Sequence, residues 1–205
     1  MNSVKLAVRS RVRLVAIWIN QLFGDRITPT QVTVFGLVAH LPIAWLIAEQ
    51  QFVIAGLLLI VFGLFDTLDG ELARLQKRVS LFGAFVDSTA DRAKEAMLYI
   101  GIGYVFAINQ QPLLVALAIF TLGVSFLVSY INAAGDATSQ QSAHVKSKAN
   151  QTYRSGLGSF EVRISLLIFG LLLNAMTAAL LIICLLGLHS IWIRTIKVKN
   201  HLRDA

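Results

Sequence analysis

The sequence predicts an all-α integral membrane protein with six transmembrane helices and an N-terminal amphipathic helix on the cytoplasmic membrane surface. Of its 205 residues, 56% are hydrophobic and only 14% are charged, and the mean hydropathy is +0.70. Soluble domains carry about a quarter charged residues, so this composition excludes an ordinary soluble enzyme and a disordered chain. The single cysteine, Cys184, excludes a disulfide framework.

The N-terminal stretch, residues 4–23, intersperses Lys and Arg with Val, Leu, Ile and Trp. Such a stretch is typical of a helix that lies in the membrane interface. Residues 25–29 (DRITP) end it before the first apolar run. We therefore expect an interfacial helix rather than the start of a membrane span, and we find no signal-peptide cleavage pattern.

Six apolar runs follow, each near the roughly 20 residues that a helix needs to cross the hydrocarbon layer. They are predicted at residues 31–48, 52–74, 81–107, 113–134, 157–174 and 176–193. Polar residues 135–156 form a predicted loop. We expect residues 1–205 to form a single membrane domain with a tail at 194–205.

The charge distribution predicts the orientation of these spans. The net charge is +7, yet the breaks at 49–51, 109–112 and 173–176 contain no Lys or Arg. By the positive-inside rule, both termini and the connections after the second and fourth spans are cytoplasmic. In so apolar a chain the basic excess indicates anionic lipid rather than nucleic acid as partner.

Four aspartates lie inside two neighbouring predicted spans. Asp66 and Asp69 follow Phe52 by 14 and 17 residues, about 21–26 Å along a helix. Asp87 and Asp91 lie at the matching depth of the next, antiparallel helix. The spacings i,i+3 and i,i+4 put each pair on one helix face, so we expect four carboxylates at one level near the cytoplasm.

Charges within membrane spans are costly and indicate function. Clustered carboxylates raise one another's pKa unless cations neutralise them, and all-oxygen ligands suit Mg²⁺ or Mn²⁺. We therefore predict two divalent cations that clamp a phosphoryl group. Gly70, Ala73 and Gly83 would let an anionic ligand approach, and Arg74 would neutralise it, although small residues also permit close helix packing.

The string Asp66-x2-Asp69-Gly70-x2-Ala73-Arg74-x8-Gly83-x3-Asp87-x3-Asp91 resembles the full signature of the CDP-alcohol phosphatidyltransferases. The resemblance implies a membrane enzyme of phospholipid biosynthesis that transfers the phosphatidyl group of CDP-diacylglycerol to a small polar alcohol and releases CMP. It also implies a homodimer and the following roles. Asp66, Asp69, Asp87 and Asp91 would hold two metals, Asp91 would be the general base, and Asp66, Asp69, Gly70, Ala73, Arg74 and Ser80 would bind CDP-diacylglycerol.

Residues 28–33 (TPTQVT) are similar to an N-terminal segment of this family that contacts CDP. This similarity adds Pro29, Thr30, Gln31 and Val32 to the expected CDP-diacylglycerol site.

The sequence identifies the acceptor alcohol less narrowly than the donor. The context of Asp87 and Asp91 and the segment Ser129-Tyr130-Ile131 resemble inositol-phosphate-type relatives, so inositol phosphate is the preferred acceptor. Those relatives continue with a Lys and an Arg where this chain has Asn132 and Ala134. Glycerol 3-phosphate, serine and an unphosphorylated polyol therefore stay open. Asn132, Arg154 and Arg163 are the expected acceptor contacts.

A cation transporter is the alternative outside enzymes, because acidic residues in helices also mark ion pathways. A transporter predicts acids spread through the membrane depth. Here the acids cluster at one level, which favours the enzyme.

Overall fold

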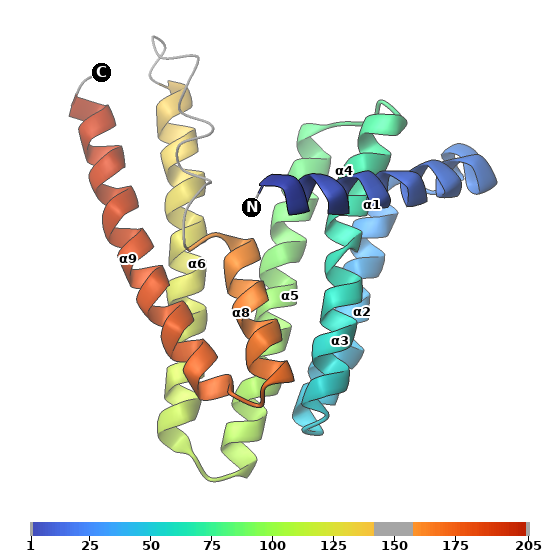
Figure 1. Ribbon diagram of the computed structural model, residues 1–205. Helices are drawn as coiled ribbons and strands as arrows, with labels where there is room; N and C mark the ends of the chain where they lie inside the picture. Colours follow the sequence, from blue (N-terminus) through green and yellow to red (C-terminus); the bar gives the residue numbers. More distant parts are fainter. Residues whose placement is uncertain (1, 142–157, 204–205) are drawn as a thin grey trace. The chain divides into compact units, whose positions relative to one another are not determined.

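The computed structural model describes residues 2–141 and 158–203, which are helical apart from short connections (Figure 1). Two compact units divide the chain, Met1–Gly101 and Ile102–Ala205, with the boundary inside the fifth helix. The helices are α1 (Asn2–Phe23), the 3-10 helix η1 (Gly24–Arg26), α2 (Pro29–Ala48), α3 (Phe52–Gly63), α4 (Phe65–Leu75), α5 (Leu81–Ile108), α6 (Pro112–Gln141), α8 (Phe160–Leu172) and α9 (Met176–Arg203).

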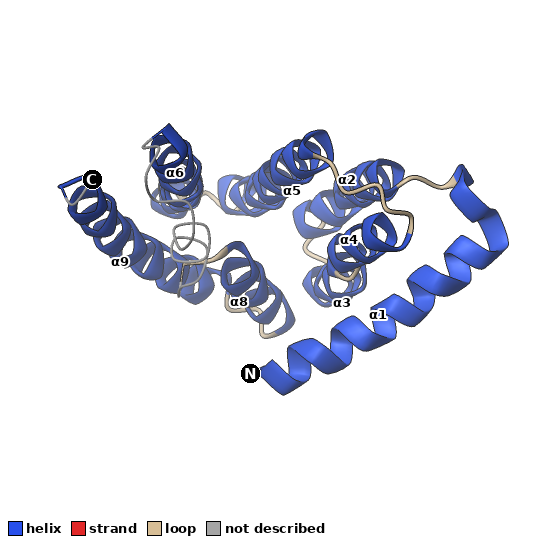
Figure 2. Cartoon of the chain, turned by 90° about the horizontal axis from the view of Figure 1, so that it is seen from above, coloured by secondary structure: helices blue, strands red, loops and turns tan. Residues whose placement is uncertain are grey.

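In the first unit, α2 packs against α3 and α4, and α1 crosses α4 (Figures 1 and 2). Val12 and Ala16 of α1 are buried against Leu68 and Leu72 of α4. The Gln76 amide, just after α4, donates to the Asn20 side chain of α1 (3.1 Å) and to the Ile27 carbonyl (2.9 Å). These contacts fix α4 to the chain that precedes α2.

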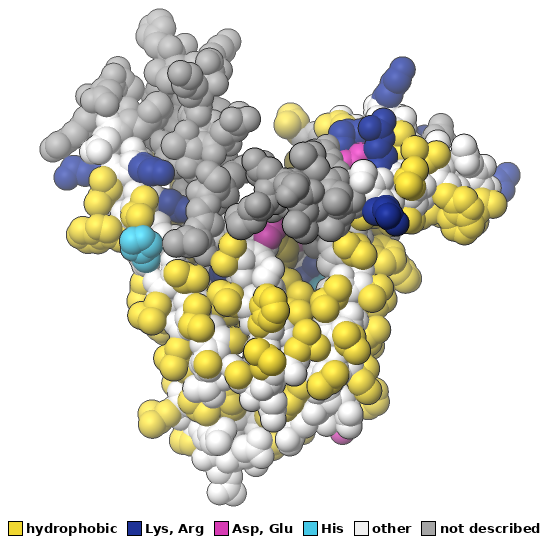
Figure 3. Space-filling model, viewed as in Figure 1, with side chains coloured by type: hydrophobic (Ala, Val, Ile, Leu, Met, Phe, Trp, Pro, Cys, Tyr) yellow, Lys and Arg dark blue, Asp and Glu magenta, His cyan; other side chains and the backbone are white. Residues whose placement is uncertain are grey.

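Among the described side chains of α1, residues 10–23, most of those outside this core are exposed, and many of these are apolar. Leu14, Trp18 and Leu22 recur every four residues and are exposed, as are Arg11 and Arg13. In Figure 3, Lys and Arg side chains gather around α1, while hydrophobic side chains cover the visible surface of the helices below it. The helix thus has one apolar face in the protein core and a second one outside it.

In the second unit, α9 packs against both α6 and α8, and small residues lie at these contacts. A side chain at Gly170 of α8 would collide with Ala179 of α9, and one at Gly187 of α9 would collide with Val124 of α6. Close backbone approach through small residues is a common way for helices to associate in lipid.

Four described segments are long and apolar enough to cross a membrane: Pro29–Ala48, Phe52–Leu75, Pro112–Gly135 and Met176–Asn200. The protein is therefore an all-α membrane protein. The predicted spans at 81–107 and 157–174 correspond to α5, which carries five charged residues, and to α8, whose helix has only 13 residues. These two spans remain predictions.

Three helix boundaries differ from the predicted ones. The predicted helix 52–74 is interrupted at Leu64, between α3 and α4. The polar stretch after residue 134 continues α6 as far as Gln141, and the predicted tail at 194–205 is helical as far as Arg203. Apolar length predicts where a helix lies in lipid, but a helix can continue into water beyond it.

Candidate active site

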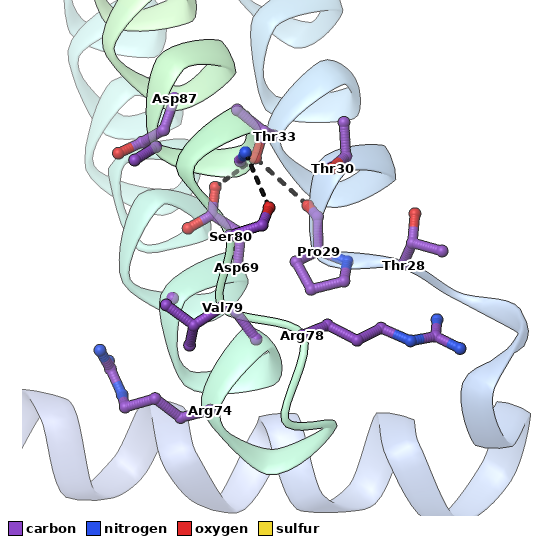
Figure 4. Close-up of a pocket in the computed structure, with 14 residues that line it drawn as sticks. Thr28, Pro29, Thr30, Thr33, Asp69, Arg74, Arg78, Val79, Ser80 and Asp87 are labelled. Carbon is purple, nitrogen blue, oxygen red and sulfur yellow. Dashed lines mark hydrogen bonds between the residues drawn. The ribbon is translucent and has the colours of Figure 1, made fainter.

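A cavity of about 430 Å³ in the first unit gathers most of the signature residues (Figure 4). It lies between the start of α2, the face of α4, the α4–α5 connection and the start of α5. We call it the signature pocket. Its lining residues are Thr28, Pro29, Thr30, Thr33, Asp69, Gly70, Ala73, Arg74, Arg78, Val79, Ser80, Gly83, Ala84 and Asp87.

The start of α2 is fixed by a capping box. The Thr28 hydroxyl accepts from the Gln31 backbone N–H (3.3 Å), and the Gln31 side chain accepts from the Thr28 N–H (2.8 Å). This reciprocal pair satisfies two N–H groups at the helix end. Of the four residues expected to bind CDP-diacylglycerol here, Pro29 and Thr30 line the pocket. Gln31 caps the helix, and Val32 is buried in the core between α1 and α4.

The buried aspartate of α4 is bonded to α2. Asp69 is only 6% exposed, and its Oδ2 accepts from the hydroxyl of Thr33, which is 5% exposed, at 2.6 Å. A buried carboxylate is costly unless hydrogen bonds or cations compensate it. The bond therefore offsets part of the cost of burying Asp69 on the pocket wall.

Gly70, Ala73 and Arg74 also line the pocket from α4. The Arg74 Nη2 lies 2.8 Å from the Glu71 carboxylate, and its side chain is 50% exposed. A side chain at Gly70 would lie against the Arg74 guanidinium, with Cβ 3.4 Å from Nη2. Glu71 orients the arginine, and Gly70 leaves room beside it.

The α4–α5 connection supplies further polar groups. Ser80 Oγ accepts from the Gly83 backbone N–H (3.0 Å) at the start of α5. A Cβ at Gly83 would lie 3.2 Å from that same oxygen. Arg78, which is exposed, also lines the pocket, and its side chain extends away from Ser80 (Figure 4). Ser80 thus caps the N-terminus of α5, and a helix N-terminus favours anions.

The third and fourth aspartates lie on α5. Asp87 lines the pocket, whereas Asp91 does not. Asp91 Oδ1 lies 3.6 Å from the fully buried Lys94 ammonium, and its Oδ2 lies 3.8 Å from Arg92. Arg92 also contacts the buried Glu95 carboxylate at 3.4 Å. The adjacent Arg92 and Lys94, one turn further along α5, therefore flank the Asp91 carboxylate.

Carboxylate oxygens fit a hard divalent cation by their chemistry. Among the side chains that the structure describes, no three His, Cys, Asp or Glu converge tightly enough to hold one ion. Asp66 lies in the first turn of α4, but its side chain falls outside the described residues. The four-aspartate metal set thus remains a prediction.

A second polar site lies inside the second unit. Arg163 of α8 is 2% exposed and donates to the Gly158 carbonyl (2.6 Å) and to the Ser129 hydroxyl of α6 (3.4 Å). Arg194 of α9 is 4% exposed and donates to the Val128 carbonyl (3.4 Å). Its positive charge is repelled by that of Arg163. We call Ser129, Arg163 and Arg194 the arginine cluster.

Two atoms beside the arginine cluster are buried without a hydrogen-bond partner among the described residues: Arg194 Nη2 and Asn132 Oδ1. Asn132 lies one helical turn beyond Ser129 on α6. Buried polar groups normally have partners, so this site has the donor and the acceptor that a polar anionic ligand would satisfy. Arg154, the third expected acceptor contact, lies outside the described residues.

Four polar residues at these sites are not among the site residues that the sequence predicts: Thr28, Thr33, Arg78 and Arg194. Thr33 ends the TPTQVT segment, and its i+4 spacing from Pro29 could have indicated that both share one face. Arg78 and Arg194 were interpreted only as cytoplasmic positive charge. No spacing within the sequence pairs Arg194 with Arg163, because the helices that carry them meet only in the folded unit.

The family model of the CDP-alcohol phosphatidyltransferases matches residues 26–196. The chain belongs to the CDP-alcohol phosphatidyltransferase family.

Individual relatives match over shorter lengths. An archaetidylinositol phosphate synthase of Pyrococcus horikoshii is 36% identical over 104 residues, 51% of this chain and 53% of the relative. A phosphatidylinositol phosphate synthase of Corynebacterium glutamicum is 32% identical over 116 residues, 55% of this chain and 53% of the relative. These alignments span about half the length of each relative.

The fold is similar to that of a phosphatidylinositol phosphate synthase of Mycobacterium tuberculosis. Its crystal structure with CDP-DAG bound has a TM-score of 0.77 and 22% identity, over 91% of this chain and 92% of that one. Its structure with manganese and citrate has a TM-score of 0.77 and 21% identity, over 91% and 88% of the two chains. At this identity the likeness establishes the fold.

Proposed function

We propose that the protein transfers the phosphatidyl group of CDP-diacylglycerol to a polar alcohol and releases CMP. The observation that carries this proposal is the signature pocket, in which Asp69, Arg74 and Asp87 line one cavity with the start of α2. The names of the relatives support it, since two of them are inositol phosphate lipid synthases. The family match extends across both units, which supports one functional domain over residues 1–205.

The donor diphosphate would bind in the signature pocket. Arg74, oriented by Glu71, and Arg78 line this cavity and carry the positive charge that a diphosphate requires. Pro29, Thr30, Gly70, Ala73 and Ser80 complete the wall, and the missing side chain at Gly70 leaves room for the nucleotide. Two divalent cations, Mg²⁺ or Mn²⁺, held by Asp66, Asp69, Asp87 and Asp91, would supply further charge stabilisation when bound.

Asp91 is the proposed general base. A hydroxyl is a poor nucleophile near neutral pH and needs a base within hydrogen-bond reach. The Asp91 carboxylate would accept the hydroxyl proton while the alcohol oxygen bonds to the phosphatidyl phosphorus. The bond from that phosphorus to the CMP oxygen breaks, and CMP leaves with its electron pair. Lys94 and Arg92, at 3.6 and 3.8 Å, limit the orientations of the carboxylate.

Inositol phosphate is the acceptor that the second unit favours. Arg163 and Arg194 are both buried, and Arg194 Nη2 has no hydrogen-bond partner among the described residues, which favours an anionic ligand here. A phosphate on Arg163 and Arg194 would provide one, and a ring hydroxyl would donate to Asn132 Oδ1. Glycerol 3-phosphate also carries a phosphate, while serine offers a carboxylate. The arginine cluster thus offsets the absence of the Lys and Arg that relatives carry after Ser129-Tyr130.

We further propose six membrane spans, with α5 and residues 157–174 completing the four that meet the length and hydropathy criteria. The lack of Lys and Arg in three of the short connections supports cytoplasmic termini and a cytoplasmic active site. The exposed apolar residues of α1 with Arg11 and Arg13 support an interfacial position. Family membership supports a homodimer.

The test is CMP release from CDP-diacylglycerol by purified protein with Mg²⁺ or Mn²⁺. The acceptor panel holds inositol phosphate, inositol, glycerol 3-phosphate and serine. We expect release with inositol phosphate only, and none without added metal. CMP release with another alcohol would identify that alcohol as the acceptor instead. No CMP release with any alcohol, from folded and metal-loaded protein, would contradict the proposed transferase activity.

A further inference from the structure

The hydroxyl of Thr33 has two possible acceptors. Its Oγ1 lies 2.6 Å from Asp69 Oδ2 and 3.2 Å from the Pro29 carbonyl oxygen (Figure 4). A threonine hydroxyl has one hydrogen to donate. Distances of about 2.5–2.7 Å are typical of hydroxyl donation to a carboxylate, which is roughly twice as strong as a neutral bond. The proton of Thr33 therefore belongs to the bond with Asp69.

The backbone holds Thr33 at this position from two sides. The capping box at Thr28 sets where α2 begins, and Thr33 follows one turn later. One turn further on, Gly36 is buried, and a Cβ there would lie 3.7 Å from the Phe65 Cβ of α4. The α2 and α4 backbones therefore approach closely here, and the hydroxyl of Thr33 is presented to Asp69 without an intervening side chain.

We propose that Thr33 is a positioning residue for Asp69, and that its hydroxyl holds the carboxylate in the orientation in which Asp69 ligates a divalent cation. The inference rests on the proposed function, in which Asp69 is a metal ligand. With Oδ2 bonded to Thr33, the carboxylate loses the freedom to rotate about its side-chain torsions. Partners that orient a ligand in this way typically change metal affinity by about 10–100-fold when removed.

A purely structural role is the competing explanation, because the same bond also offsets the cost of burying Asp69. The two roles predict changes in different measured quantities. A structural role lowers the unfolding temperature whether or not metal is present. A positioning role weakens Mn²⁺ binding and raises the KM for metal, while the KM for the acceptor stays the same.

The experiment compares wild type with Thr33→Val, which removes the hydroxyl at similar volume, and Thr33→Ser, which keeps it. Mn²⁺ binding is measured by electron paramagnetic resonance on detergent-purified protein, alongside the unfolding temperature without metal. We expect Mn²⁺ to bind about 10–100-fold more weakly to Thr33→Val, and Thr33→Ser to recover most of the affinity. Thr195→Val is the matched control, since within the described part of the chain its exposed hydroxyl donates to the Ile191 carbonyl of its own helix (2.8 Å).

Equal Mn²⁺ affinity of folded Thr33→Val and wild type would overturn the inference, whatever the change in unfolding temperature. Thr33→Ser as weak as Thr33→Val would also overturn it, because the hydroxyl would then not be the acting group. A wild type that binds Mn²⁺ but releases no CMP would refute the proposed transfer and leave these affinities to decide the role of Thr33. A wild type that binds no Mn²⁺ would refute both.

Discussion

The signature pocket of the first unit draws ten of its fourteen lining residues from one stretch, residues 69–87. The arginine cluster of the second unit draws on three helices, and its outer members, Ser129 and Arg194, are 65 positions apart. Both sites have buried charge. In the pocket, the Asp69 carboxylate accepts from a hydroxyl, whereas in the cluster the guanidinium groups donate to backbone carbonyls. This difference matches the two binding tasks that we propose: a donor diphosphate with cations in the pocket, and the anionic group of the acceptor at the cluster.

Removal of the proposed base has the largest expected effect. Asp91→Asn keeps the size of the side chain but removes its ability to accept a proton, and general bases typically contribute 10²–10⁴-fold, so we expect a loss of roughly that size in kcat. CMP release under saturating donor and acceptor measures it. Glu49→Gln, which changes an exposed carboxylate at the C-terminal end of α2 away from the signature pocket lining, is the control. Unchanged turnover in Asp91→Asn would remove Asp91 as the base.

The next largest effect distinguishes the two sites directly. Arg194→Gln removes a buried charge of the arginine cluster, and hydrogen bonds to charged groups contribute about 1.5–3 kcal/mol. We expect the KM for inositol phosphate to rise on the order of 10–100-fold, with the KM for CDP-diacylglycerol unchanged. Steady-state kinetics with each substrate varied in turn measures the split. A matching rise for CDP-diacylglycerol would show that the cluster does not serve the acceptor alone.

The third prediction concerns the signature pocket, where a substitution should affect the donor rather than the acceptor. Arg74→Gln should raise the KM for CDP-diacylglycerol by about tenfold, at the low end for a charged hydrogen bond because the side chain is half exposed. The KM for the acceptor should not change. Arg74→Lys, which keeps the charge but loses the planar fork, should lie between the two. If Arg74→Gln affected only the acceptor, the assignment of the two sites would be reversed.

The smallest expected effect concerns the frame of the pocket. Thr28→Ala removes the capping box of α2 and should destabilise the protein by about 1 kcal/mol. The unfolding midpoint in detergent measures it, with Thr28→Ser as the conservative control. A midpoint equal to that of wild type would mean that packing against α3 and α4, rather than the cap, sets the start of α2.

The comparison of the two sites also explains what sequence can predict. Helix spacing predicts that Asp66 and Asp69 share one face of a helix. The structure brings Asp69 and Asp87 to one cavity. This proximity was predictable because a short connection between antiparallel helices keeps the adjoining ends of both helices close together. The bond from Thr33 to Asp69 spans 36 positions and depends on the close approach of α2 and α4. Arg194 lies at the end of an apolar run, where positive-inside charge is the ordinary interpretation. Its burial follows from packing between α6 and α9, which no local pattern encodes.

The identity of the lipid product tests transfer more directly than any variant. Purified protein is incubated with CDP-diacylglycerol, inositol phosphate and Mn²⁺, and the lipid extract is analysed by mass spectrometry while CMP is quantified. We predict a lipid that carries both the phosphatidyl group and the phosphorylated inositol, formed in a one-to-one ratio with CMP. Phosphatidic acid with CMP would mean hydrolysis by water, and unchanged CDP-diacylglycerol would contradict the transfer altogether.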